Sequence, residues 1–111
     1  MAEAGWTIDE YTTASGDSPI RTFLSELQER DRVEAFALIR LLAERGNTLR
    51  LPHSQPLGEG LHELRGKQVR IFYVFKPQKR VLLLNGILKK RKDIPAAVLK
   101  RLRKLRREVD P

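Results

Sequence analysis

Residues that can carry out chemistry gather in three segments of the second half of the chain. The first is the hexapeptide Gly-Leu-His-Glu-Leu-Arg at residues 60–65, the second is Arg70 within an apolar run, and the third is the Lys-Lys-Arg-Lys run at residues 89–92. The chain has no cysteine, which excludes disulfides, thiolate metal sites and a cysteine nucleophile. The two histidines, His53 and His62, are isolated and make a poor metal-binding set. Any chemistry must therefore use Lys, Arg, His, Tyr and carboxylate side chains.

These residue types are suited to the cleavage of RNA. If their strands are neighbours, Arg65, Arg70 and Lys90 converge on one rim of a sheet and form a cationic pocket for a phosphodiester. Cleavage then needs a base that removes the proton of the ribose 2′-OH, cations that stabilise the charge growing on phosphorus, and an acid that protonates the departing 5′-oxygen. His62 has the intrinsic pKa best suited to the base, although Lys or Arg remain alternatives. Because the RNA supplies the nucleophile, we expect no metal and no other cofactor.

Charge is unevenly distributed along the chain, which carries a formal net charge of +8. Residues 1–48 hold five Lys and Arg against nine Asp and Glu, whereas residues 49–111 hold seventeen against five. The second half should therefore bind a polyanion. Charge alone does not distinguish RNA from DNA, nor either of them from an acidic protein.

Length and composition predict one domain that spans residues 1–111, because two independent cores would each be too small. The longest apolar runs, such as residues 81–84, are too short to cross a bilayer, so no membrane association is expected. The first residues lack both a basic leader and an apolar stretch, which favours a cytoplasmic location.

Periodicity predicts a strand followed by a helical hairpin in the first half. Residues 6–11 alternate apolar or β-prone side chains with polar ones, as in a half-buried strand. Ser18 and Pro19 are typical of an N-cap and a first helical position, and Asp31 is expected to cap a second helix that ends near residues 46–47. The apolar stripe of the first helix is expected to contain Ile20, Phe23, Leu24 and Leu27. That of the second is expected to contain Val33, Phe36, Ala37, Leu38, Ile39, Leu41 and Leu42.

The second half is expected to form three strands and a basic helix. Residues 48–60 contain two prolines and two glycines and are predicted to be a long ordered loop. Strands are predicted at residues 61–65, 69–75 and 80–87, joined by short turns in an antiparallel meander. Pro95 opens a last helix, whose apolar stripe is Val98, Leu102, Leu105 and Val109. The order β-α-α-β-β-β-α predicts an α+β fold, with an antiparallel sheet, an N-terminal helical hairpin and a C-terminal basic helix.

The stretches GLHELRGKQVRIFYVF and VLLLNGILKKRKDIP resemble the signature of the phage-derived HigB-like branch of the RelE toxin superfamily, which belongs to type II toxin–antitoxin systems. The resemblance covers most of the chain and implies a RelE-like fold. It further implies a ribosome-dependent endoribonuclease, an mRNA interferase that leaves a 2′,3′-cyclic phosphate or its hydrolysed 3′-phosphate. The implied partners are mRNA on the ribosome, ribosomal RNA, and a helix-turn-helix antitoxin similar to HigA.

Carried over to this sequence, the resemblance places Arg65, Arg70 and Lys90 among the catalytic cations around the scissile phosphate, with Lys89 beside Lys90. His62 stands where the family commonly has an aromatic residue. A tyrosine that RelE has near the start of its last segment is replaced here by alanine, so the identity of the general base stays open. The residues expected to contact RNA or the ribosome are Lys67, Lys89, Arg91, Lys92, Lys100, Arg103, Lys104 and Arg107.

Several of these residues have a structural alternative. Glu63 and Arg65 can form an ordinary ion pair on the sheet surface, and Arg70, set among apolar residues, needs either a buried partner or a ligand. The basic run at residues 89–92 can instead discourage edge-to-edge pairing. The last helix can follow ribosomal RNA, lie under the antitoxin, or simply pack on its own domain.

Two other functions remain open on the sequence alone. One is a non-catalytic nucleic-acid-binding module that uses the same basic surface. The other is an inactive toxin relative that only binds an antitoxin. A neighbouring gene for a helix-turn-helix protein, together with growth arrest on expression, would distinguish the nuclease from both. The sequence predicts neither codon preference nor self-association.

Overall fold

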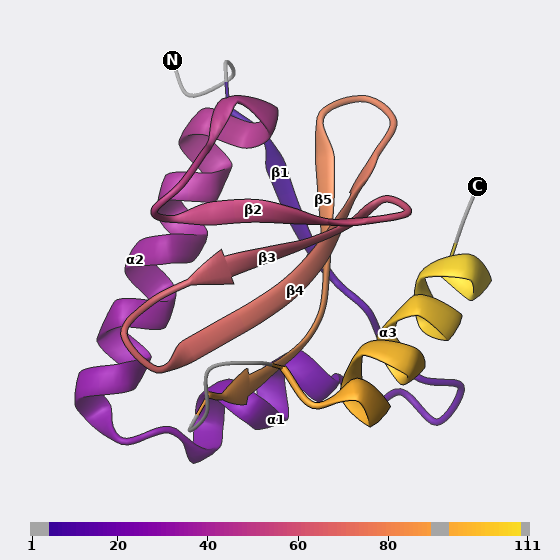
Figure 1. Ribbon diagram of the computed structural model, residues 1–111, viewed down its shortest axis with the longest axis horizontal. Helices are drawn as coiled ribbons and strands as arrows, with labels where there is room; N and C mark the ends of the chain where they lie inside the picture. Colours follow the sequence, from indigo (N-terminus) through magenta and orange to yellow (C-terminus); the bar gives the residue numbers. More distant parts are fainter. Residues whose placement is uncertain (1–4, 90–93, 110–111) are drawn as a thin grey trace.

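The computed structural model describes residues 5–89 and 94–109. Within these residues the structure has five strands and three α-helices, with a short 3-10 helix at Gly46–Thr48 (Figure 1). In chain order these elements are β1 (Thr7–Glu10), α1 (Pro19–Glu26), α2 (Glu29–Arg45), β2 (Ser54–Gly58), β3 (Leu61–Arg65), β4 (Val69–Lys76), β5 (Arg80–Leu88) and α3 (Ala96–Val109). Within this part of the chain, no helix is long and apolar enough to cross a membrane.

The strands form one sheet in the order β1-β5-β4-β3-β2. Strands β2 to β5 pair antiparallel with their neighbours in sequence, as short connections require. Strand β1 instead pairs parallel with β5, so that Thr7 lies opposite Arg80 and Glu10 opposite Leu83. The sheet is therefore mostly antiparallel and the predicted α+β fold is confirmed. The strand predicted at residues 6–11 is present as β1, but the local pattern did not indicate its parallel pairing with β5.

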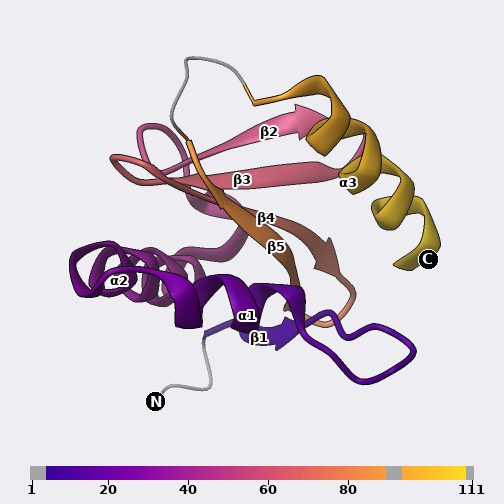
Figure 2. The same cartoon turned by 90° about the horizontal axis from the view of Figure 1, so that it is seen from below.

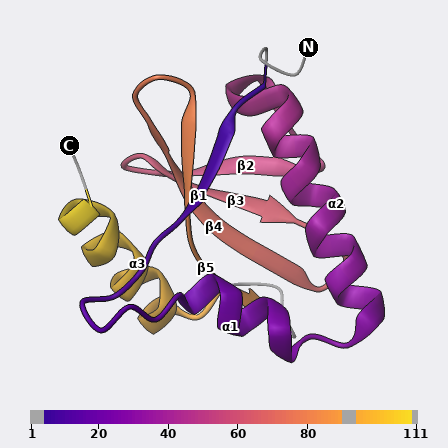
Figure 3. The same cartoon turned by 180° about the vertical axis from the view of Figure 1, so that it is seen from behind.

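Helices cover both faces of the sheet. In the view from below, α1 and α2 lie on one side and α3 on the other (Figure 2), and the view from behind shows α2 lying across the sheet (Figure 3). On the α2 face, Ile71 and Tyr73 of β4 pack into one apolar cluster, and on the α3 face Phe72 and Val74 pack into a second with Leu102. Successive residues of β4 therefore alternate between the two faces, and most of this strand is buried on both.

The first helix begins as predicted. The Ser18 hydroxyl accepts a hydrogen bond from the Arg21 N–H at 3.2 Å, and Pro19 is the first helical residue. The cap predicted for the second helix is wrong, because α2 begins at Glu29 after Gln28, which makes no side-chain cap. Only two residues separate the helices, and the buried Leu27 anchors this connection, so Asp31 falls inside the first turn.

The stripe predicted for the second helix is also partly wrong. The buried positions of α2 are Asp31, Ala35, Leu38 and Leu42. Val33 and Phe36 are 63% and 53% exposed, and Ala37 is exposed as well. The reason is geometric: α2 contacts the sheet along one narrow side, and with 3.6 residues per turn these apolar positions point away from it.

The predicted loop at residues 48–60 contains a strand, which corrects that prediction. Strand β2 forms the edge of the sheet and pairs antiparallel with β3, with an irregularity between Pro56 and Gly58. A proline cannot donate to a ladder of hydrogen bonds, but an edge strand has one side without a partner strand and tolerates it. The prolines and glycines therefore correctly indicated irregular backbone in this segment, but they did not exclude an edge strand.

Candidate functional site

Glu63, Arg65 and Arg70 lie on the α3 face of the sheet. In the pairing of β3 with β4, Glu63 is opposite Phe72 and Arg65 is opposite Arg70. Residues opposite one another on antiparallel strands project to the same face, and Phe72 belongs to the cluster under α3. The structure therefore brings Arg65 and Arg70 together, as their positions in the sequence suggested.

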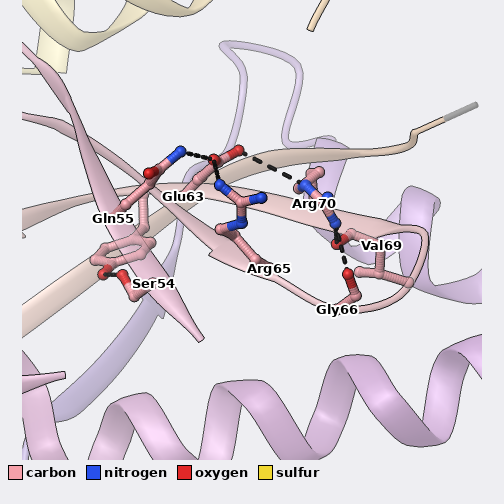
Figure 4. A network of polar contacts seen from close by, with 8 residues as sticks. Ser54, Gln55, Glu63, Arg65, Gly66, Val69 and Arg70 are labelled. Carbon is pink, nitrogen blue, oxygen red and sulfur yellow. Dashed lines mark hydrogen bonds and ion pairs between the residues drawn. The ribbon is translucent and has the colours of Figure 1, made fainter. Parts of the chain in front are cut away.

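The Glu63 carboxylate is the centre of this group, and we call Gln55, Glu63, Arg65 and Arg70 the Glu63 cluster (Figure 4). Arg65 Nη1 donates to Glu63 Oε2 at 3.4 Å, and Arg70 Nε lies 3.9 Å from Oε1. Gln55, opposite Glu63 on β2, donates from Nε2 to Oε2 at 2.7 Å. Glu63 is only 2% exposed. One buried carboxylate thus lies within ion-pair distance of two guanidinium groups, and the three groups together keep a net positive charge.

Arg70 is directed toward the turn that joins β3 and β4. Its Nη1 donates to the carbonyl oxygens of Gly66 at 2.7 Å and Val69 at 2.9 Å. Burial lowers the pKa of Arg70, and the neighbouring positive charge of Arg65 lowers it further. Because the side chain is buried and turned to backbone carbonyls, much of its hydrogen-bonding capacity is used within the protein.

The same turn is held from the α2 side by Glu34. Both carboxylate oxygens of Glu34 accept the Lys67 backbone N–H at 3.1 Å. A side chain at Gly66 would bring its Cβ to 2.4 Å from Glu34 Oε1, so this approach requires glycine. Glu34 on one side and Arg70 on the other fix the turn, and with it the relative position of β3 and β4.

Arg65 is the accessible guanidinium of the pair. Its side chain is 30% exposed, compared with 8% for Arg70. A guanidinium carries five N–H donors, and its planar fork matches two phosphate oxygens. Arg65 can therefore hold Glu63 with one edge and still contact an anion from solvent.

His62 lies on the opposite face of the sheet from the Glu63 cluster. Its ring stacks on Tyr73 at a centroid distance of 5.4 Å and meets Phe75 edge-on at 4.9 Å. Burial lowers the pKa of His62. The Tyr73 hydroxyl shares a 2.6 Å hydrogen bond with Ser54, and burial raises the pKa of Tyr73. The structure thus separates His62 from the two arginines with which the sequence grouped it.

Two other candidate residues, Lys67 and Lys89, lie at the end of the sheet that carries the β3–β4 turn. Lys67 is exposed in the β3–β4 turn. The Lys89 backbone N–H donates to the Gln68 carbonyl oxygen at 2.6 Å, which places the end of β5 beside this turn. Lys90, Arg91 and Lys92 lie outside the described residues.

The basic residues of α3 divide into two groups. Lys100, Lys104 and Arg107 are exposed. Arg103 faces the β2–β3 hairpin instead, donating to the carbonyl oxygens of Leu57 at 2.8 Å and Gly58 at 3.2 Å. It also pairs with Glu59 at 3.5 Å. Arg103 therefore attaches α3 to the hairpin, whereas the exposed cations remain available to a partner.

Two polar residues around the site were not found from the sequence. Gln55 lies in the segment that was predicted to be a loop. The only sequence signal for a strand there was a weak alternation of apolar and polar side chains around Gln55. Glu34 was one acidic residue among many on α2. Within the described parts of the chain, no group of three or more His, Asp or Glu residues is placed to hold a metal ion.

Comparisons with known proteins agree with this fold. The family model described as Phage derived protein Gp49-like (DUF891) matches residues 22–107. Among solved structures, the chain resembles one in the crystal structure of the toxin–antitoxin complex RelBE2 from Mycobacterium tuberculosis. The TM-score is 0.59 at 19% sequence identity, over 77% of this chain and 99% of that chain, a likeness that shows the fold. No curated protein matches. The resemblance seen in the sequence is thus confirmed, and the chain belongs to the phage-derived Gp49-like family, a family of RelE/HigB-type toxins.

Proposed function

We propose that this protein is the toxin of a toxin–antitoxin system and that it cleaves mRNA on the ribosome. Membership of a family of RelE/HigB-type toxins supports the first part. The observation that carries the second is the pairing of Arg65 and Arg70 around Glu63, on the face of the sheet that also bears the basic helix α3. Two guanidinium groups, one of them accessible, form a site where a phosphodiester can be held while charge builds on it.

In the proposed mechanism, Arg65 contacts the scissile phosphate directly. The ribose 2′-oxygen attacks phosphorus as a base takes its proton, the bond to the 5′-oxygen breaks, and that oxygen leaves with a proton from an acid. The products are a 2′,3′-cyclic phosphate and a free 5′-hydroxyl. Arg65 stabilises the charge that grows on the non-bridging oxygens of the phosphate. Arg70, which is more deeply buried, adds positive charge to the site and holds the turn between β3 and β4. Lys90 is proposed as a third cation on the sequence resemblance.

His62 is not well placed for the base in this mechanism. It lies on the α2 face, between the rings of Tyr73 and Phe75, whereas Arg65 lies on the α3 face. A base must come within hydrogen-bond reach of the proton that it removes. The contacts of His62 support a packing role.

The exposed cations supply the proposed contact with ribosomal RNA. Phosphate contacts release counterions, so such binding is sequence-independent and sensitive to salt. Those exposed in the structure are Lys67, Lys100, Lys104 and Arg107. Lys89, which is half-buried, and Arg91 and Lys92, which lie outside the described residues, are proposed on the sequence resemblance. Action on translating ribosomes also implies a cytoplasmic location.

An antitoxin completes the proposal. The solved structure that this chain resembles is that of a toxin–antitoxin complex. We infer that this chain also binds a partner protein, that the partner holds it inactive, and that the partner is a helix-turn-helix protein similar to HigA.

Induced expression with mapping of mRNA ends tests the proposal. New ends within translated regions, in register with codons and accompanied by growth arrest, are expected. Purified protein should produce the same ends on programmed ribosomes with no metal beyond the Mg²⁺ that the ribosomes themselves require. Normal growth without new ends would contradict the proposal, and growth arrest without cleavage would favour a non-catalytic nucleic-acid-binding module.

A further inference from the structure

Burial of the Glu63 carboxylate is energetically unfavourable at this position. A buried carboxylate loses its hydration, and even a good ion pair rarely does more than compensate for that loss. Its neighbours on the same face, Leu61 and Phe72, show that apolar side chains fit this part of the sheet. Packing alone therefore does not explain why a carboxylate lies between the two arginines.

The contacts of the carboxylate indicate what it does. Oε2 accepts from both Gln55, at 2.7 Å, and Arg65, at 3.4 Å. Gln55 is directly opposite on the neighbouring strand, so the shorter contact holds the carboxylate in place. Among the described residues Oε1 accepts no hydrogen bond, and it faces Arg70 Nε at 3.9 Å. Glu63 is thus fixed from one side by Gln55 and presents a fixed acceptor to Arg65 on the other.

Arg65 needs such an anchor. Its long side chain is part-exposed at the last residue of β3, where it would otherwise exchange between rotamers. A guanidinium stabilises a transition state fully only if its donors are already aimed at the charge that develops. Arg70 differs, because its Nη1 is already held by backbone carbonyls.

We propose that Glu63 is a positioning residue, supported by Gln55, which orients the Arg65 guanidinium toward the scissile phosphate. The inference rests on the proposed function of Arg65. It predicts that loss of Glu63 or Gln55 slows the chemical step and leaves ribosome binding unchanged. Arg65 keeps its charge in these variants, but its guanidinium is no longer held in one orientation.

The test uses Glu63→Gln and Gln55→Ala in the full chain. The matched control is Glu59→Gln, which removes a carboxylate–arginine pair on the exposed side of the same hairpin. Single-turnover cleavage on programmed ribosomes is measured against toxin concentration. We expect Glu63→Gln to lower the saturating rate about 10- to 100-fold, as a small misplacement of a catalytic group does. The half-saturating concentration should not change, and Gln55→Ala should show the same pattern more weakly.

A second measurement does not depend on activity. The side-chain Nε–H signal of Arg65, followed by NMR relaxation in the free protein, should report an ordered group in the wild type and in Glu59→Gln. It should become mobile in Glu63→Gln and in Gln55→Ala. If Glu63→Gln does not fold, Gln55→Ala provides both readouts.

Each outcome has a separate meaning. If Arg65 remains ordered in both variants, or if the variants change only the half-saturating concentration or the melting temperature, the positioning role is wrong. A rate loss from Glu63→Gln that is equally large in an Arg65→Ala background also overturns it, because the effect would not pass through Arg65. If the wild type cleaves no mRNA, the proposed function fails, while the relaxation data still decide whether Glu63 orders Arg65.

Discussion

Arg70 Nη1 lies 2.7 Å from the carbonyl oxygen of Gly66, four residues earlier in the chain. The arginine that the sequence offered as a phosphate clamp thus holds the turn between its own strand and the strand of Arg65. This contact separates two roles for neighbouring arginines: Arg70 maintains the geometry of the site, and Arg65 is accessible to a ligand.

Substitutions at Arg70 should act mainly on stability. Arg70→Met leaves Glu63 buried with less positive charge and removes a donor from the carbonyl oxygens of Gly66 and Val69, so the free energy of unfolding should fall by about 3 kcal/mol. Arg70→Lys keeps a charge but loses the planar fork, and we expect a smaller loss with near-normal cleavage per folded molecule. Thermal melting and single-turnover cleavage measure the two effects. An Arg70→Lys protein of normal stability that cleaves about 100-fold more slowly would assign Arg70 to the phosphate instead.

Arg65→Ala should relieve growth arrest without unfolding the protein. Loss of one contact to the charge that develops in a transition state typically costs about 10²-fold in rate. Arg70 still faces the Glu63 carboxylate and Gln55 still donates to it, so folding should be destabilised less than by Arg70→Met. Growth on induction and cleavage on ribosomes measure activity, and circular dichroism must remain native. Arg30→Ala, at an exposed position of α2, is the control. Undiminished toxicity of Arg65→Ala would place the site elsewhere.

His62→Phe should retain toxicity and change only the response of stability to acid. Burial lowers the pKa of His62 in the folded protein below the value of about 6.5 in the unfolded chain. The unfolded chain therefore binds the proton more tightly, and stability that is present above this pH decreases as the pH falls through it. Melting temperatures between pH 7.5 and 5.5 should fall more in the wild type than in His62→Phe. Loss of mRNA cleavage in a folded His62→Phe protein would restore His62 as the candidate base.

Two adjacent cations of α3 should behave differently. Lys104 is exposed, so Lys104→Ala should weaken ribosome binding and reduce the slope of log K against log salt by about 1. Arg103 holds the β2–β3 hairpin, so Arg103→Ala should make α3 more sensitive to limited proteolysis. Binding titrations at several salt concentrations and protease digestion separate the two. An identical salt slope for Lys104→Ala and wild type would exclude Lys104 from the RNA contact.

Local patterns were sufficient for most of the fold. The bounds predicted for β3 match the structure, those for β4 and β5 differ by one residue, and Ser18 caps α1 as expected. These features depend on the period of side chains along one strand or on contacts within one turn, so neighbouring residues contain the information.

The site depended on contacts between segments that are distant in the chain. Pairing of β2 with β3 decided that Gln55 supports Glu63, and the packing of α2 decided that Val33 and Phe36 face solvent. Alternation along β3 already separates His62 from Glu63 and Arg65, but only the register with β4 showed that Arg70 joins Arg65 while His62 stacks on Tyr73. Since side chains alternate between faces with a period of two, a shift of one residue in register would have exchanged these partners. Register and helix orientation are set by the packing of the whole domain, which a local sequence pattern does not contain.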